Sequence, residues 1–116
     1  MARVDVGTRA GLYEGSTLRG YCHFEYDNSS GTTSRNCRLR IEATGSQTFT
    51  VNFNNITING VNKGSVSGVK QNSGIIWTGS VAAGSATAKW TNPWYAGTKT
   101  PEVTGTIPSG ATAPTG

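Results

Sequence analysis

Residues 17–26, TLRGYCHFEY, alternate between apolar and polar side chains, and this alternation decides the fold. One face carries Cys22, Phe24 and Tyr26, and the other carries Tyr21, His23 and Glu25. A period of two with one apolar face is typical of a strand in a sheet that is buried on one side. The turn-forming residues DNSSG follow at 27–31, and CRLRIE at 37–42 alternates in the same way. These residues therefore predict an antiparallel hairpin with one buried and one solvated face.

Strand-like runs recur about every ten residues along the rest of the chain. Residues 48–53 alternate again, Asn59-Gly60 suits a type I′ hairpin turn, and further runs lie at 75–81, 86–90 and 102–107. We predict an all-β fold, an antiparallel, immunoglobulin-like β-sandwich of about seven to nine short strands over residues 1–107. Residues 108–116, rich in Pro, Gly and Thr, are predicted to form a flexible tail. The predicted core contains Phe24, Leu39, Ile41, Phe49, Val51 and Trp77.

Charge is sparse in this chain of 116 residues, whose length fits a single domain. Charged residues make up 14% of it, against about a quarter in an average domain, and the net charge is +4. The one basic concentration is Arg35, Arg38 and Arg40, which Glu25 and Glu42 dilute. We interpret both glutamates as ion-pair partners of Arg38 and Arg40 on a solvated sheet face, so nucleic-acid binding is not expected.

Neither a membrane span nor a signal peptide is visible in the sequence. No apolar run approaches the roughly 20 residues that cross a bilayer, and the first residues, MARVDV, lack the apolar stretch of a secretory signal. We expect no membrane insertion. Removal of a signal peptide before maturation stays open.

The residues that usually carry catalysis do not form a recognisable set. His23 is the sole histidine, and a Ser-His-Asp triad would need an acid such as Asp5 or Asp27 beside an activated serine. No Gly-x-Ser-x-Gly elbow, phosphate-binding glycine loop or calcium loop is present. We therefore predict a protein that is not an enzyme and has no metal site and no cofactor, with His23 on the surface.

Cys22 and Cys37 are the two cysteines of the chain. If the first hairpin turns around Ser29-Ser30, these cysteines lie opposite each other on the apolar face. Their Cα atoms would then be about 4.5 Å apart, near the short limit for a disulfide. A disulfide and a pair of reduced, buried thiols stay open as alternatives.

A third group of residues surrounds Asn92-Pro93. Because proline interrupts a ladder, Pro93 predicts a break in the strand, with at least one of Trp90, Trp94 and Tyr95 on a loop. Flat rings beside the Asn92 amide suit a sugar-binding surface. The alternatives are that these rings cap the core or fill a subunit interface.

Five short motifs follow one another over the last two thirds of the chain: CRLRI at 37–41, ITING at 56–60, WTGSV at 77–81, GTKT at 97–100 and TIP at 106–108. Their order resembles small β-sandwich domains in tail and other structural proteins of tailed bacteriophages that infect Gram-positive bacteria. The resemblance implies an immunoglobulin-like virion component with possible adhesion to cell-wall glycans, and it transfers no catalytic residues.

We therefore expect a non-enzymatic bacteriophage structural or accessory protein, a tail component or capsid decoration located in the virion after assembly in the host cytoplasm. Its expected partners are other virion proteins or copies of itself, together with cell-wall polysaccharide. Its glycan-binding or interface residues would be Trp90, Asn92, Trp94 and Tyr95. The alternative is a secreted carbohydrate-binding module excised from a glycoside hydrolase, with the segment from Pro108 as its linker.

Overall fold

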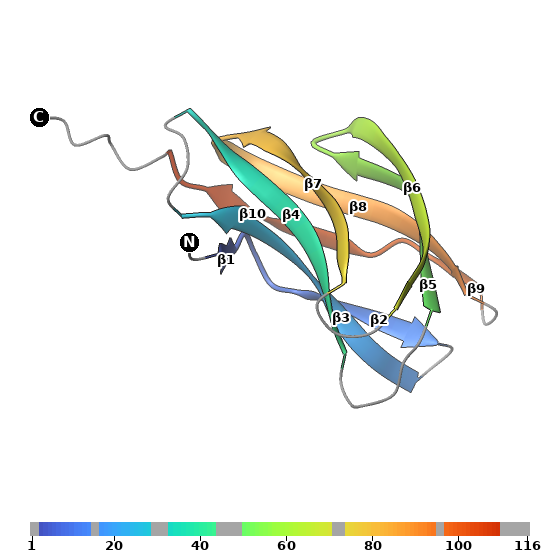
Figure 1. Cartoon of the computed structure of the whole chain (residues 1–116). Helices are drawn as coiled ribbons and strands as arrows, with labels where there is room; N and C mark the ends of the chain where they lie inside the picture. The colour runs from blue at the N-terminus through green and yellow to red at the C-terminus, as the bar shows by residue number, and fades with distance from the viewer. Residues whose placement is uncertain are drawn as a thin grey trace, which may run out of the picture.

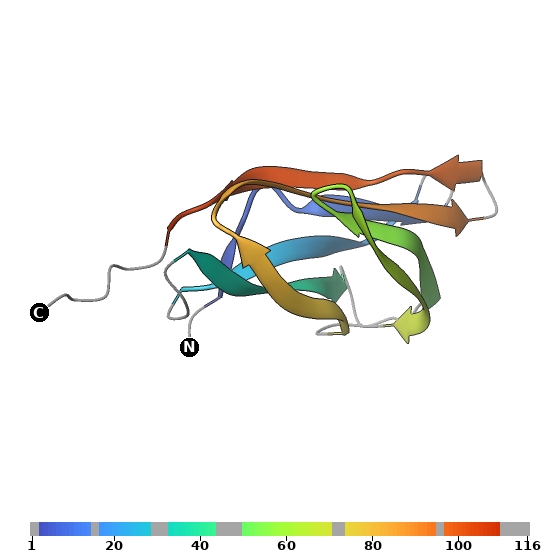
Figure 2. The same ribbon diagram turned by 90° about the horizontal axis from the view of Figure 1, so that it is seen from above.

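The computed structural model describes residues 3–14, 17–28, 33–43, 50–70, 74–94 and 97–109. Within these segments the strands pair antiparallel in two sheets, which pack against each other as two layers (Figure 1 and Figure 2). This arrangement confirms the predicted all-β antiparallel sandwich.

Sheet A contains β1 (Arg3–Asp5), β2 (Ala10–Glu14), β3 (Thr17–Asp27), β4 (Ser34–Ala43) and β7 (Ile75–Ala82). Its order is β1-β3-β4-β7, and β2 also pairs with β3. Sheet B contains β5 (Thr50–Ile58), β6 (Val61–Lys70), β8 (Gly84–Trp94), β9 (Gly97–Lys99) and β10 (Glu102–Ile107). Its order is β10-β8-β5-β6, and β9 also pairs with β8.

β3 and β4 form the predicted hairpin, which lies at the centre of sheet A. Phe24 pairs with Leu39, and Cys22 pairs with Ile41. Opposite residues in an antiparallel ladder face the same side, so the apolar faces of the two strands coincide. All four side chains are fully buried, and the predicted inward face of the hairpin is confirmed.

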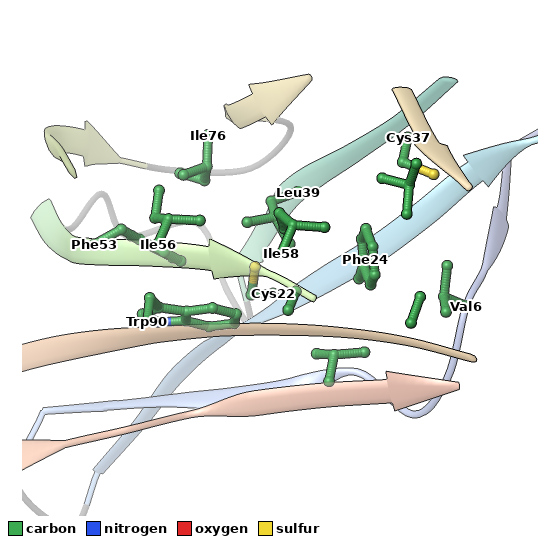
Figure 3. Close-up of a cluster of buried hydrophobic side chains, with 14 of the residues drawn as sticks. Val6, Cys22, Phe24, Cys37, Leu39, Phe53, Ile56, Ile58, Ile76 and Trp90 are labelled. Atoms are coloured by element: carbon green, nitrogen blue, oxygen red, sulfur yellow. The ribbon is translucent and has the colours of Figure 1, made fainter. Parts of the chain in front are cut away.

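The core lies between the two sheets and draws on both of them (Figure 3). Its largest fully buried side chains are Trp90, Phe24, Phe53, Leu12, Leu39, Ile41, Ile56, Ile107 and Val103. Burying one such side chain contributes about 1.5–3 kcal/mol, so these residues supply much of the apolar driving force for folding.

The other predicted core residues have mixed outcomes. Trp77 is half-buried and packs against the core from β7, which is the edge strand of sheet A. Phe49 lies outside the described residues, and so does the side chain of Val51. The core predictions for Phe49 and Val51 therefore stay predictions.

The hairpin of β5 and β6 has the predicted turn. Asn59 and Gly60 have φ of 53° and 82°, as the two central residues of a type I′ turn require, and Ile58 pairs with Val61 across it. Asn59 also exchanges hydrogen bonds with Thr87 of β8, since its N–H donates to the Thr87 carbonyl and its Oδ1 accepts from the Thr87 N–H, each at 2.8 Å. These bonds attach the turn to the neighbouring strand.

A glycine pair joins the two sheets at one side. Gly7 follows β1 of sheet A and forms a β-bridge with Gly105 of β10 in sheet B. A Cβ atom on Gly7 would overlap the carbonyl of Thr104, and one on Gly105 would overlap the carbonyl of Val6. Only glycine lets the two backbones approach this closely, so both positions are fixed by packing.

Arg35 binds the residues that follow the last strand, β10, to sheet A. Its guanidinium is 3% exposed and donates to the carbonyl oxygens of Pro108 at 2.9 Å, Asp27 at 3.1 Å and Ser109 at 3.2 Å. It also lies over the Tyr26 ring, 5.1 Å from the ring centre. These bonds hold the first two residues of the predicted tail against the domain, and the flexible tail itself stays a prediction.

Candidate functional site

Trp90 belongs to the core. It lies on β8 with 1% of its surface exposed, and its ring centre is 4.8 Å from that of Phe53 (Figure 3). A covered ring cannot stack on a sugar, so the prediction that Trp90 contacts a glycan is wrong. The alternative prediction, that this ring packs in the core, is confirmed. The alternation of Ala86, Ala88 and Trp90, all buried, is the sequence signal that could have shown this.

β8 does not stop before Pro93, and the predicted break in the strand is wrong. The strand runs to Trp94, and Pro93 faces Thr98 of β9. The described pairs between β8 and β5 end at Thr91 with Asn54, so none of them includes Pro93. A proline is tolerated where the ladder on one side has ended.

The remaining glycan candidates lie at the end of the β8–β9 hairpin. Asn92 pairs with Lys99, and Trp94 pairs with Gly97. The side chains of Asn92 and Trp94 lie outside the described part of the structure, as does all of Tyr95. Their role as glycan-binding or interface residues stays a prediction.

Cys22 and Cys37 are not opposite each other, and the predicted hairpin register is wrong. Cys22 faces Ile41 and Cys37 faces Tyr26, which centres the hairpin two residues after Ser29-Ser30. Both thiols are free and buried. Burial raises the pKa of Cys37 to about 11 and holds the pKa of Cys22 far above its ordinary value. Protonated, covered thiols are poor nucleophiles, so both cysteines serve as small apolar residues.

The outward face of sheet A carries a polar cluster that includes His23. Although it points away from the core, His23 is only 7% exposed. Its Nδ1 is 2.8 Å from Oδ1 of Asp5 on β1, and its Nε2 is 2.6 Å from Oε1 of Glu42 on β4. The predicted surface position of His23 is therefore wrong. The imidazole joins three neighbouring strands through two carboxylates.

Glu25 forms the second half of the cluster and is 6% exposed. Its Oε1 accepts from Arg38 Nε at 2.7 Å, and its Oε2 accepts from Arg40 Nη2 at 3.1 Å. Burial acts to raise the pKa of Glu25, but the hydrogen bonds from both arginines outweigh burial and hold this pKa below its ordinary value. The predicted pairing of Glu25 with Arg38 and Arg40 is confirmed.

Glu42 has other partners than predicted. It accepts hydrogen bonds from His23 and from Arg9 Nη1, the latter at 2.9 Å. These bonds, with that of His23 first, lower the pKa of Glu42. The guanidinium of Arg9 lies 3.6 Å from the centre of the Tyr21 ring. The stem and guanidinium of Arg9 thus cover part of the Tyr21 ring while its charged end stays in contact with water.

The cluster of Asp5, Arg9, Tyr21, His23, Glu25, Arg38, Arg40 and Glu42, which we call the outer polar cluster, is the most ordered polar assembly in the described residues. Both nitrogens of His23 face carboxylates, so neither is turned toward a nucleophile whose proton it could accept. The geometry suits the joining of β1, β3 and β4.

The ligand atoms of Asp5, His23 and Glu25 lie within 4.8 Å of one another, and these residues were tested as a metal centre. A tetrahedral ion with bonds of about 2.1 Å holds its ligand atoms about 3.4 Å apart. Both oxygens of Glu25 already accept from the guanidinium groups of Arg38 and Arg40. Because a cation would have to displace these arginines, we assign no metal to this set.

Sequence reasoning predicted the Glu25 half of the outer polar cluster and missed the His23 half, because two residues of that half come from outside the predicted strands. Asp5 lies on β1, a strand of three residues, and Arg9 lies between β1 and β2. One feature of the sequence could have indicated these contacts: Asp5 and the sole histidine, His23, lie on the polar faces of neighbouring strands.

No helix able to span a membrane occurs in the residues that the structure describes. Comparison with known proteins identifies no relative: no family model, no curated protein and no solved structure matches the chain.

Proposed function

We propose that the protein is a non-enzymatic structural or accessory component of a bacteriophage virion, mounted on a tail or capsid, and that it adheres to host-surface glycans. The sequence motifs at 37–41, 56–60, 77–81, 97–100 and 106–108 support the virion context. The two-sheet sandwich is consistent with it, because a rigid sandwich presents binding loops at its ends.

The position of the β8–β9 hairpin carries the adhesion part of the proposal. This hairpin lies at one end of the domain, whereas β1 and the end of β10 lie at the opposite end (Figure 1). A domain attached through its chain ends would point the hairpin away from its attachment. Trp94 and Tyr95 belong to this segment of the sequence, so we propose them as the aromatic residues that contact the glycan.

The expected contact is weak for one copy. Stacking that buries about 100 Å² of apolar surface contributes about 2.5 kcal/mol before ordering costs. A virion that displays many copies would convert such contacts into stable adhesion by multivalency. Weak single sites therefore fit a repeated component.

The test measures binding of multivalent protein to purified Gram-positive cell-wall polysaccharide. The double variant Trp94→Ala/Tyr95→Ala is expected to lose at least about tenfold in affinity, which corresponds to about 1.4 kcal/mol. Val61→Ala is the matched control, because Val61 is an exposed apolar residue on β6, outside the β8–β9 hairpin. Unchanged binding by the double variant would refute the proposal that the β8–β9 hairpin binds the glycan.

A secreted carbohydrate-binding module is the second candidate, because it would use the same hairpin aromatics. The genomic context distinguishes the two functions. Neighbouring capsid and tail genes support the virion component, and a reading frame continuous with a glycosidase domain supports the module.

A further inference from the structure

We infer that β7 is a self-association edge, at which a second copy of this chain adds its own β7 antiparallel and extends sheet A across a two-fold axis. In the described residues β7 pairs with β4 on one side and with no strand on the other. An edge strand presents unpaired N–H and C=O groups that a further strand can bind. The inference stands apart from the proposed function, because it requires neither a glycan nor a virion.

Three other strands at the edges of the two sheets, β6, β10 and β1, carry features that oppose strand addition. β6 has the exposed Lys63, a positive φ at Gly64 and three register shifts against β5. β10 begins at Glu102 and is approached by Gly7 on its open side. β1 has three residues, two of them charged. Charges, bulges and short strands are the usual protection of an edge.

β7 has less of this protection. Its sequence, IIWTGSVA, contains no charged residue and no proline, and its one register shift against β4 lies at its start, between Ile75 and Trp77, so that it pairs regularly from Trp77 to Ala82. Ile75 is 43% exposed at its start. The nearest cation, Lys63, lies 5.9 Å from the centre of the Trp77 ring and so belongs to the inner side of the strand. An uncharged, β-branched edge is the kind that pairs with another strand.

The absence of charge on β7 favours a second copy of this chain as the partner that pairs with its open edge. β7 against β7 brings no charged residue opposite another, whereas β6 against β6 would place lysines close together. On β4, the neighbouring strand, Arg38 is already neutralised by Glu25 at 2.7 Å. Self-pairing of β7 therefore places no two charged residues of this strand opposite each other.

One register that matches the inward and outward faces of β7 has Gly79 on the axis, because residues that lie opposite each other then share a face. Thr78 then faces Ser80 of the second copy on the outer side, and Trp77 faces Val81 on the inner side. Both combinations, hydroxyl with hydroxyl and aromatic with β-branched, are favourable cross-strand pairs. The half-buried Trp77 ring, which already lies over Gly79, would gain cover from the second copy.

One short strand buries less than the roughly 1,600 Å² of a standard interface, so the dimer should be weak and depend on concentration. Sedimentation equilibrium from about 1 µM to about 1 mM, a range that brackets weak association, is the primary test. The expected result is a mass that rises from the monomer value of 12.1 kDa toward twice that value. Over the same range, amides of β7 should gain protection from hydrogen exchange.

Ser80→Lys is expected to keep the protein monomeric throughout this range, because it places two ammonium groups beside the two-fold axis. Ser85→Lys is the matched control: Ser85 is equally exposed but lies on β8, which has neighbours on both sides, so this variant should dimerise like wild type. Thermal unfolding of both variants checks that they fold. A wild-type protein that stays monomeric at every concentration, or a dimer that survives Ser80→Lys, would overturn the inference.

Discussion

The outward faces of the two sheets differ in kind, although both follow the same alternation. On sheet A, His23 and Glu25 point outward and are nevertheless 7% and 6% exposed; His23 contacts two carboxylates and Glu25 contacts two arginines. On sheet B, the outward side chains of Thr104, Thr106 and Glu102 are exposed. Long charged side chains have built a second, polar layer on one sheet, and short hydroxyl side chains have left the other sheet open. A period of two thus tells which way a residue points and not whether water reaches it.

The two faces should differ most in how much the free energy of unfolding falls when one glutamate is removed. Glu25→Ala should lower the free energy of unfolding by about 3 kcal/mol, the low end for a broken buried ion pair, because it strands two partly covered guanidinium groups. Glu102→Ala, on the open face, should change it by less than about 0.5 kcal/mol. Urea unfolding of both variants measures the contrast. Equal losses would show that the outer polar cluster contributes no special stability.

A smaller loss of stability is expected at acidic pH. The pKa values of Glu25 and Glu42 are lowered from the ordinary 4.5. Their stabilising contribution is therefore complete above about pH 4.5 and is lost as the pH falls through the lower folded pKa values. Unfolding free energies measured on both sides of pH 4.5 should decline toward acid. The loss should be smaller than that of Glu25→Ala, since a protonated carboxyl can still accept a hydrogen bond.

Glu25→Gln removes one of the two titrating groups and should flatten this decline, whereas Glu102→Gln should leave it unchanged. A decline of the same steepness in Glu25→Gln and wild type would contradict the assignment of acid sensitivity to the outer polar cluster.

The smallest effect is expected on the open face. Thr87 Oγ1 lies 3.2 Å from Thr104 Oγ1, and this contact is exposed to water. Thr87→Val keeps the shape of the side chain and removes the contact, so the free energy of unfolding should change by less than about 0.5 kcal/mol. Thermal and urea unfolding check this. A loss above about 1 kcal/mol would mean that the hydroxyls of sheet B form a stabilising network after all.

The inward faces were predictable because alternation within one strand is a local signal. Phe24, Leu39 and Ile41 follow it, and all three are in the core. The positive φ of Asn59 and Gly60 was equally local, because the two residues define the turn themselves.

Features that depend on distant segments were not predictable. The pairing of Cys22 with Ile41 depends on where the turn between β3 and β4 is centred, and a run of several turn-forming residues does not define this. The burial of His23 depends on Asp5, which a short strand brings alongside β3. Trp90 was misjudged because the rule for proline was applied to a strand whose ladder ends on one side before Pro93.

The hydrogen bonds of Arg35 also determine how the domain would bear a mechanical load. The guanidinium belongs to β4 in sheet A, and it holds the carbonyl oxygens of Pro108 and Ser109, which directly follow β10 in sheet B. A pull on the chain beyond Ser109 is therefore shared with sheet A before the ladder between β10 and β8 carries all of it. The last strand would resist peeling until this attachment yields, and tension would spread through both layers.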